Sequence, residues 1–318
     1  MKVRVLYHDH CFDGAASAAF FSKFSRECFY NGAEYAYTGM AHKAAQLFDE
    51  SEFDGDENVI VDFKYSPSDK VTWWFDHHQS AFLSAADQRD YEGKKDKRRF
   101  YFNPTYRSCT EWIAHIAKTV YSYEPPELAE LVYWAGIVDG ADYDSAEAAV
   151  SMREPAMKLT LLIEAIKCSE MVQRIIRQMQ VKTLEEILHD PVVSEAFQPL
   201  YDRHLRSIDV IRAASECRDK VIFFDVADQD MEGYSKFIPY YLFPEGVYTV
   251  SVSKASFRTK VSVGSNPWAA EEPTHNLAAI CERYGGGGHP RVGAISFQPS
   301  EVEAARAAAA EIVQELRG

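Results

Sequence analysis

Apolar residues in the first quarter of the chain occur in short runs that polar segments separate. Runs at residues 3–7, 35–38, 59–62 and 71–75 have the length and residue types of buried strands. Alanine-rich residues 15–24 and residues 41–49 have helical patterns and follow the first two runs. Alternation of strand and helix predicts a parallel sheet with helices on both faces, so we expect an α/β domain here.

The remaining pattern changes from helical to mixed. Helices are predicted at 108–120 and 128–138 and through most of 155–214, where Leu159, Leu162, Ile163 and Ile166 have the spacing of one buried helix face. The mixed-charge run 88–99 is interpreted as a solvated hairpin or loop. Strands at 221–224, 247–252, 259–263 and 292–297, with helices at 276–284 and 301–316, predict a smaller α+β domain. The expected organisation is a first domain at 1–200, a connector at 201–219 and a second domain at 220–318.

Carboxylates and imidazoles follow three of the predicted strands. The first strand leads into the stretch His8 to Gly14, the third ends at Asp62, and the fourth leads into the run 76–78, Asp-His-His. Ligands of open α/β sheets bind beyond the carboxyl ends of the strands, where these side chains converge. Helix capping accounts for Asp13 alone, but it does not predict donors at three strand ends.

A divalent metal site suits this donor set. Oxygen-dominated ligation with one or two imidazoles favours Mn²⁺ or Mg²⁺ over zinc. Two such ions, about 3.5–4 Å apart and bridged by a carboxylate, activate water and hold a phosphoryl oxygen. Acids at 139, 142 and 144 follow a predicted helix, and one of them is a further candidate ligand.

A run of four glycines precedes His289 and Pro290, between a predicted helix and a predicted strand. Glycine allows backbone N–H groups to turn toward an anion, so Gly286, Gly287, Gly288 and His289 are expected to bind phosphate. Lys254 and Arg258, beside a predicted strand, are candidates for the same role, and a solvated surface pair is an equal alternative for these two.

Composition limits the possible partners. The 318 residues are 47% hydrophobic and carry a formal net charge of -14, which argues against the basic track that binds duplex DNA. Six cysteines without a CxxC spacing fit a reducing compartment rather than a structural zinc site. The first residues do not resemble a signal peptide, and no apolar run has membrane-spanning length. We therefore expect a cytoplasmic protein without a membrane partner.

Taken in order, these motifs resemble the DHH phosphoesterase family, including its C-terminal DHHA1-type domain. The resemblance rests on residues 8–17, Asp62, the run 76–78, Asp139 and the run 285–290, and spans nearly the whole chain. It implies metal-dependent hydrolysis of phosphoester or phosphoanhydride bonds. Its members include enzymes of the oligoribonuclease, exopolyphosphatase-like and single-strand exonuclease types, which act on short oligonucleotides, nucleoside phosphates, cyclic dinucleotides or polyphosphate.

The resemblance also implies roles for individual residues. Asp13, Asp139 and His77 correspond to ligands of one Mn²⁺ or Mg²⁺ ion, and Asp62 to a carboxylate that bridges two ions. His78 corresponds to a phosphate contact or an acid near the leaving group, and Asp76 to its catalytic neighbour. His289 and the backbone of Gly286 and Gly287 correspond to a distal phosphate grip.

Cys11 departs from the family pattern, because an aspartate is usual two residues before Asp13. In the small pyrophosphatase branch a histidine is usual where Tyr7 stands here. Three arrangements are compatible with this departure: Asp9, His8 or His10 replaces the usual ligand, Cys11 binds a softer metal as thiolate, or the second ion binds weakly and with substrate.

The resulting prediction is a phosphoesterase that uses metal-activated water on a small phosphorylated substrate or short oligonucleotide. A homodimer is compatible with the sequence. Two alternatives are a nucleotide or phosphate sensor with a decayed metal site, marked by Cys11, and a single-strand exonuclease, which the net charge disfavours. We expect the second domain to bring His289 and the glycine run toward the metals, with a hinge near residues 203–219.

Overall fold

Two compact units make up the chain in the computed structural model, which describes residues 1–41, 48–97, 99–166, 168–229, 231 and 233–318. The first unit contains Met1–Tyr143 and Arg153–Leu200, and the second contains Asp144–Met152 and Tyr201–Gly318. The helix predicted at 41–49 falls mainly on residues 42–47, which lie outside the described residues. No described helix combines the length and the apolar character needed to cross a membrane.

The first unit is built on a five-stranded sheet in the order β2-β1-β3-β4-β5, with every neighbouring pair parallel. This confirms the predicted parallel-sheet domain. Since β2 lies on one side of β1 and β3 on the other, the strand order reverses between β1 and β3. The strands are β1 (Lys2–His8), β2 (Glu34–Met40), β3 (Glu57–Val61), β4 (Val71–Asp76) and β5 (Arg99–Phe102).

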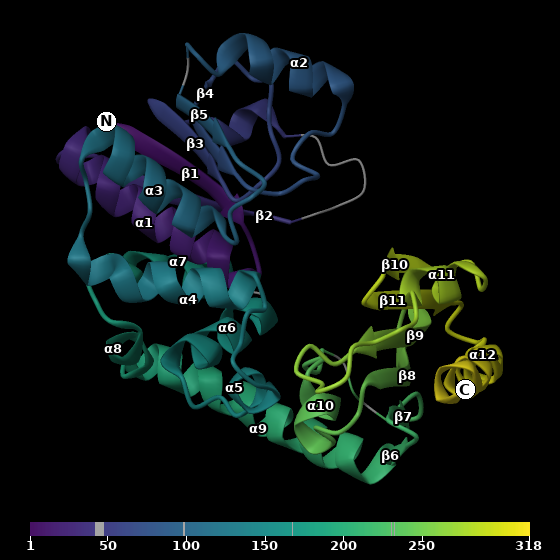
Figure 1. The fold of residues 1–318 in the computed structure, drawn as a ribbon. Helices are drawn as coiled ribbons and strands as arrows, with labels where there is room; N and C mark the ends of the chain where they lie inside the picture. Colours follow the sequence, from purple (N-terminus) through teal and green to yellow (C-terminus); the bar gives the residue numbers. More distant parts are fainter. Residues whose placement is uncertain (42–47, 98, 167, 230, 232) are drawn as a thin grey trace. The chain divides into compact units, whose positions relative to one another are not determined.

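Helices cover both faces of this sheet (Figure 1). On one face, α1 and α3 pack against Val5, Val59 and Trp73, and α2 adds Tyr91 to the cluster around Leu6 and Trp74 on the other face. Further helices pack behind α1. The helices of the first unit are α1 (Phe12–Cys28), α2 (Ala85–Lys94), α3 (Cys109–Tyr121), α4 (Ala129–Asp139), α6 (Pro155–Ala165), α7 (Ser169–Met179) and α8 (Leu184–Leu188), with one-turn helices η1 (Glu50–Glu52) and η2 (Pro126–Leu128).

The mixed-charge run 88–99 was predicted wrongly as a hairpin or loop. Residues 88–94 are the end of helix α2, residues 95–97 form a turn, and Arg99 begins strand β5. Ser84 caps α2 by accepting a hydrogen bond from the Asp87 N–H at 3.2 Å. Only Tyr91 of this helix is buried, and it packs against Trp74 and Phe82. One anchoring ring gives no periodic pattern in the sequence, so tertiary contacts decide the helix.

The second unit has a six-stranded mixed sheet in the order β10-β11-β9-β8-β7-β6, with only β7 and β8 parallel. This confirms the smaller α+β domain. Its core contains Val250, Val263 and Ile312. The elements are α5 (Ala146–Val150), β6 (Ser215–Arg218), β7 (Val221–Asp225), α10 (Ile238–Leu242), β8 (Tyr248–Ala255), β9 (Arg258–Ser265), α11 (Leu277–Glu282), β10 (Gly287–His289), β11 (Val292–Phe297) and α12 (Val302–Arg317).

Residues 201–219, for which a separate connector was predicted, are regular structure. Helix α9 (Pro191–Ala214) begins in the first unit and ends in the second, and β6 follows it directly. His204 on this helix lies within the second unit, where its Nε2 donates to the carbonyl oxygen of Val150 at 2.8 Å. The segment Asp144–Met152, which includes α5, belongs to the same unit.

Candidate metal centre

Donor side chains gather at the edge of the first sheet where the strand order reverses. His8 is the last residue of β1, and Asp62 follows β3 directly. The fold thus places both at the point where open α/β sheets bind ligands. Asp76 ends β4, and His77 and His78 follow it. The predicted convergence of three strand ends is therefore present in the structure.

Three groups of donors lie close enough to hold cations. In each group, one ligand atom per residue lies within 4.8 Å of the others. Asp62 belongs to two groups, and His77 also belongs to two. The groups are His8 with Cys11 and Asp62, Asp62 with His77 and His78, and Asp13 with His77 and Asp139. This shared membership makes the three groups one continuous centre.

Asp62 is central to this arrangement. Its carboxylate is fully buried, and its oxygens lie 3.4 Å from His8 Nδ1, 3.5 Å from His77 Nε2 and 3.7 Å from His78 Nδ1. Its φ of 56° is in the left-handed region, which is unfavourable for a residue other than glycine and often marks a functional site. Burial acts to raise the pKa of Asp62, but the contacts with His77 and His8 outweigh it and hold the pKa below its ordinary value.

His77 has two distinct sides. Its Nδ1 donates to the carbonyl oxygen of Tyr106 at 3.0 Å, so Nε2 faces the carboxylates. Nε2 lies 3.3 Å from Asp139 Oδ2 and 3.8 Å from Asp13 Oδ2. Burial lowers the pKa of His77, but the neighbouring carboxylates, Asp62 first, outweigh it and raise the pKa to about 10. Without a metal ion, a proton on Nε2 therefore offsets part of the negative charge.

Asp13 and Asp139 come from helix ends. Asp13 is in the first turn of α1 and accepts hydrogen bonds from the N–H groups of Cys109 and Thr110, at 2.6 and 3.0 Å. Asp139 is the last residue of α4, where the helix dipole disfavours a negative charge. Burial and then Asp62 raise the pKa values of both carboxyls, that of Asp139 to about 6.

Gly14 explains why α1 can begin so close to β1. A Cβ at this position would lie 2.0 Å from the carbonyl oxygen of His8, so a larger residue would push the first helical turn away from the strand. Cys11 occupies the N-cap position of α1 and makes no capping hydrogen bond with its side chain. Burial and the charges of Asp62 and Asp13 raise the pKa of the Cys11 thiol well above its ordinary value, so it is a neutral thiol in the metal-free protein.

Asp76 holds the two histidines that follow it in place. Its Oδ1 accepts hydrogen bonds from the His77 and His78 N–H groups, at 2.8 and 3.2 Å, and lies 2.7 Å from His78 Nδ1. Asp76 and Asp62 outweigh the effect of burial and raise the pKa of His78 to about 8. Asp76 therefore orients His78, and the catalytic role predicted for it is a positioning role in this geometry.

Asp9 does not join the three groups. Its carboxylate accepts from the His10 N–H at 3.0 Å and lies 3.7 Å from His10 Nε2. His10 has a φ of 55°, and this turn separates Asp9 from the donors on either side of it. Of the replacements considered for the usual ligand at Cys11, the structure brings His8 into a group and leaves Asp9 and His10 outside.

The predicted phosphate residues of the second unit are not gathered at one place. Gly287, Gly288 and His289 form β10, and the Gly286 N–H donates to the Cys281 carbonyl oxygen at 2.9 Å, so this N–H is not turned toward a ligand. Gly288 has a φ of 155°, and a Cβ there would lie 2.1 Å from the Val292 carbonyl oxygen. Packing against β11 thus requires glycine at this position.

Arg258 and His289 are at opposite ends of the second sheet. His289 pairs with Val292, which pairs with Gly264 on β9, whereas Arg258 is the first residue of that strand. Arg258 therefore lies six residues along β9 from Gly264, the residue level with His289, which is roughly 20 Å along the strand. Arg258 donates to Ser296 Oγ at 3.3 Å and lies over the ring of Phe257. The structure therefore does not bring Arg258 and His289 together.

Sequence reasoning missed the groups that hold the ligands in place. Ser108 caps α3, and the next two N–H groups bind Asp13. The capping pattern Ser-x-x-Glu before a helix was available as a signal for this element. The carbonyl oxygen of Tyr106, which orients His77, had no signal because any residue can supply a backbone oxygen.

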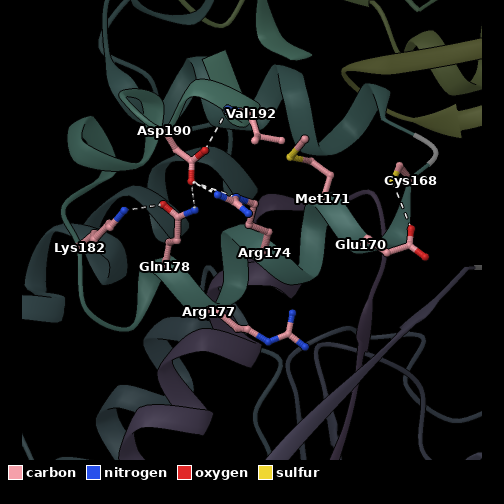
Figure 2. A pocket seen from close by; sticks show the side chains of 9 residues that line it. All are labelled: Cys168, Glu170, Met171, Arg174, Arg177, Gln178, Lys182, Asp190 and Val192. Carbon is pink, nitrogen blue, oxygen red and sulfur yellow. Dashed lines mark hydrogen bonds and ion pairs between the residues drawn. The ribbon is translucent and has the colours of Figure 1, made fainter. Parts of the chain in front are cut away.

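A cavity lies on the α7 surface of the first unit (Figure 2). This cavity has a volume of about 640 Å³. Arg174 and Gln178 donate to Asp190 there, at distances of 2.6–2.9 Å. None of the donors of the metal centre lines it. The lining residues are Cys168, Glu170, Met171, Arg174, Arg177, Gln178, Lys182, Asp190 and Val192.

No family model matches the sequence, and no curated protein matches it. Similar solved structures include a pGpG-specific phosphodiesterase, PggH, from Vibrio cholerae, with a TM-score of 0.72 and 15% identity over 99% of both chains. An exopolyphosphatase-related protein from Bacteroides fragilis has a TM-score of 0.54 and 15% identity, over 99% of this chain and 92% of that one.

RecJ from Thermus thermophilus, solved with Mn²⁺, has a TM-score of 0.56 and 13% identity, over 99% of this chain and 52% of its own. These neighbours are DHH/DHHA1 proteins. The resemblance indicated by the motifs is thereby confirmed at the level of the fold.

Proposed function

We propose that this chain, which has the DHH/DHHA1 fold, is a metal-dependent phosphoesterase that hydrolyses a small phosphorylated substrate or short oligonucleotide. The observation that carries the proposal is a set of buried side-chain atoms that could ligate a metal ion and form no hydrogen bond. Both oxygens of Asp62 and the Nε2 of His77 are buried and lack a hydrogen-bond partner among the described residues. Buried polar atoms are normally hydrogen-bonded, whereas these atoms face one another and neighbouring side chains at 3.3–3.7 Å without forming hydrogen bonds, so as a converging set they fit a cation.

The residues present fit Mn²⁺ or Mg²⁺. Asp13, Asp139 and His77 would hold one ion, and Asp62 with His8, Cys11 or His78 would hold a second. Carboxylate oxygens with one or two imidazoles are typical of manganese and magnesium sites. A bound divalent ion supplies an attacking water of lowered pKa and stabilises charge on phosphoryl oxygens. One or two ions are compatible with the grouping.

His78 is the candidate for contact with a phosphate oxygen or for protonation of the leaving group. Asp76 holds its Nδ1 at 2.7 Å, and Asp76 with Asp62 raises the pKa of His78 to about 8. The side chain is 31% exposed, so it is accessible to a ligand. It can donate a hydrogen bond to a phosphate oxygen or a proton to the leaving oxygen, and Asp76 keeps the ring in orientation for either role.

Charge supports a small substrate over a long strand. The chain has a formal net charge of -14, so many phosphates cannot be neutralised along it. A bound metal ion reverses the sign only locally. The structural neighbours include a protein described as a pGpG-specific phosphodiesterase, and pGpG is a dinucleotide.

The test is hydrolysis of bis-p-nitrophenyl phosphate and of 5′-phosphorylated diguanylate, with Mn²⁺, with Mg²⁺ and with chelator. We expect turnover with metal and a fall of about 10³-fold in His77→Ala. The matched control is His189→Ala, at the C-cap of α8. The His189 side chain is 73% exposed, and the variant should retain the activity of the unaltered protein.

Three outcomes would contradict the proposal. Retained turnover in His77→Ala would reject the metal assignment. Nucleotide binding without hydrolysis under any metal condition would instead indicate a sensor with a decayed centre. A steep fall of activity with salt on long single strands, but not on dinucleotides, would indicate an exonuclease.

A further inference from the structure

Three aromatic rings pack together where the segment that connects β5 to α3 meets the first half of α3. The ring centroids of Tyr106 and Trp112 are 4.7 Å apart, and those of Tyr106 and His115 are 5.5 Å apart. Trp112 and His115 are stacked, at 5.6 Å with an interplanar angle of 14°. His115 is exposed, and Tyr106 and Trp112 are half-buried. We refer to these three residues as the ring cluster.

The ring cluster is tied to the metal centre through the backbone. The carbonyl oxygen of Tyr106 accepts the hydrogen bond from His77 Nδ1 at 3.0 Å. The Cys109 and Thr110 N–H groups, which bind Asp13, come from the start of the same helix. The segment that fixes two of the metal donors therefore also carries the rings, and their distance from the centre is set by rigid structure.

Core packing does not explain the whole cluster. The buried face of α3 includes Ile113, Ile116 and Ala117. Trp112 contacts the edge of that core with part of its surface, but His115 is turned to solvent. His115 is exposed and stacked on Trp112, so an aromatic face of the ring cluster is accessible to solvent.

The charge next to the cluster favours a base over a phosphate. Arg107, the cation in the same segment, donates to Glu111 at 2.7 Å and to Asp142 at 3.0 Å. Its charge is thus already balanced by carboxylates. The surface offers aromatic faces, which stack on nucleobases with little dependence on sequence.

We propose that the ring cluster is a stacking surface for a nucleobase of the substrate. This inference rests on the proposed phosphoesterase function and deepens it, because it makes nucleotides, rather than base-free polyphosphates, the substrate class of the centre. Stacking contributes equally to the ground state and the transition state, so it acts mainly on KM. Purines, which have the larger aromatic face, bind better than pyrimidines.

The experiment compares 5′-phosphorylated diadenylate with an analogue that has the same phosphates and sugars but no bases. The readout is the ratio of the two kcat/KM values with Mn²⁺. In Trp112→Leu we expect this ratio to fall about 10-fold, through KM rather than kcat. The control is Tyr133→Leu on α4, whose ring is 57% exposed and contacts Trp134, and which should keep the ratio of the unaltered protein.

A second variant, Tyr106→Leu with His115→Ala, covers the case in which Trp112→Leu does not fold. It keeps the Tyr106 backbone carbonyl and thus the contact with His77. An unchanged ratio in the folded variants overturns the stacking surface.

Failure of the phosphoesterase proposal can be distinguished from failure of the stacking surface. If the unaltered protein hydrolyses neither compound, quenching of tryptophan fluorescence by adenosine monophosphate is compared with that in Trp112→Phe. A loss of quenching in the variant supports the stacking surface, and equal quenching overturns it.

Discussion

Asp62 and Asp190 are both buried carboxylates of the first unit, and their surroundings differ. Asp190, beside the α7 cavity, accepts two hydrogen bonds from Arg174, one from Gln178 and one from the Val192 N–H. Asp62 makes none within the described part of the chain and lies among imidazoles and further carboxylates. Burial of charge is common to both. Only the unsatisfied carboxylate indicates a ligand, because a saturated one has already met its partners inside the protein.

Asp62→Asn gives the largest expected difference between the two sites. Asparagine tolerates the left-handed backbone at this position, so the substitution removes charge and a shared ligand with little strain. We expect phosphoester hydrolysis to fall by about 10³-fold or more. Mn²⁺ titration calorimetry and turnover should both report the loss. Asp190→Asn should retain both properties, and an equal loss in the two variants would remove the distinction between the sites.

Mn²⁺ should stabilise the unaltered protein by about 2.7 kcal/mol when its free concentration is 100 times Kd, because it binds the folded chain selectively. The measurement is urea denaturation with and without the ion. Asp190→Asn should show the same increment, since its site has no vacant donors, and Asp62→Asn should show little. An increment in Asp62→Asn as large as that of the unaltered protein would place the cation elsewhere.

Asp190→Ala should lower the free energy of unfolding by about 2 kcal/mol. Asp190 caps the first turn of α9 by accepting a hydrogen bond from the Val192 N–H, and it also accepts hydrogen bonds from Arg174 and Gln178. Loss of the cap and loss of the side-chain hydrogen bonds should each cost about 1 kcal/mol. The Mn²⁺ affinity should be unchanged. Chemical denaturation measures the first quantity and calorimetry the second. No loss of stability would show that the network is dispensable.

The smallest predicted effect is a dependence of stability on acid pH. Arg174 holds the pKa of Asp190 at about 2, below the ordinary value of 3.8. A lowered pKa in the folded state contributes stability above the unfolded value, and that contribution is lost as pH falls from about 4 to about 2. The difference in unfolding free energy between the unaltered protein and Asp190→Asn should therefore be smaller at pH 3 than at pH 6. A constant difference would contradict the pKa assignment.

The convergence of strand ends was predictable because parallel strands present their carboxyl ends at one edge. His8, Asp62 and the run 76–78 followed from that rule alone. The side chain of Asp9 did not, because its carboxylate accepts a hydrogen bond from the neighbouring His10 N–H, a local contact that the strand pattern does not reveal. The separation of Arg258 from His289 also could not be predicted, because it is set by the pairing of β9 with β11.

Helix α2 shows that local sequence pattern also fails to predict some elements of the fold. Half of its ten residues are charged, and its one buried ring packs against Trp74 and Phe82. Local pattern identifies elements that bury a continuous face, and it fails for elements held by one distant contact. The hydrogen bond from His77 to the Tyr106 carbonyl oxygen belongs to this class as well, because it joins positions 29 residues apart.

The insertion of Asp144–Met152 into the second unit bears on how a gene of this kind can be rearranged. Ala146 packs against Ile222 and Tyr240, and Val150 accepts a hydrogen bond from His204. A fragment encoding residues 201–318 alone would lack α5 and leave that apolar contact open to water. Neither unit is one continuous stretch of sequence. Recombination between relatives should therefore exchange residues 144–152 together with residues 201–318, or exchange neither.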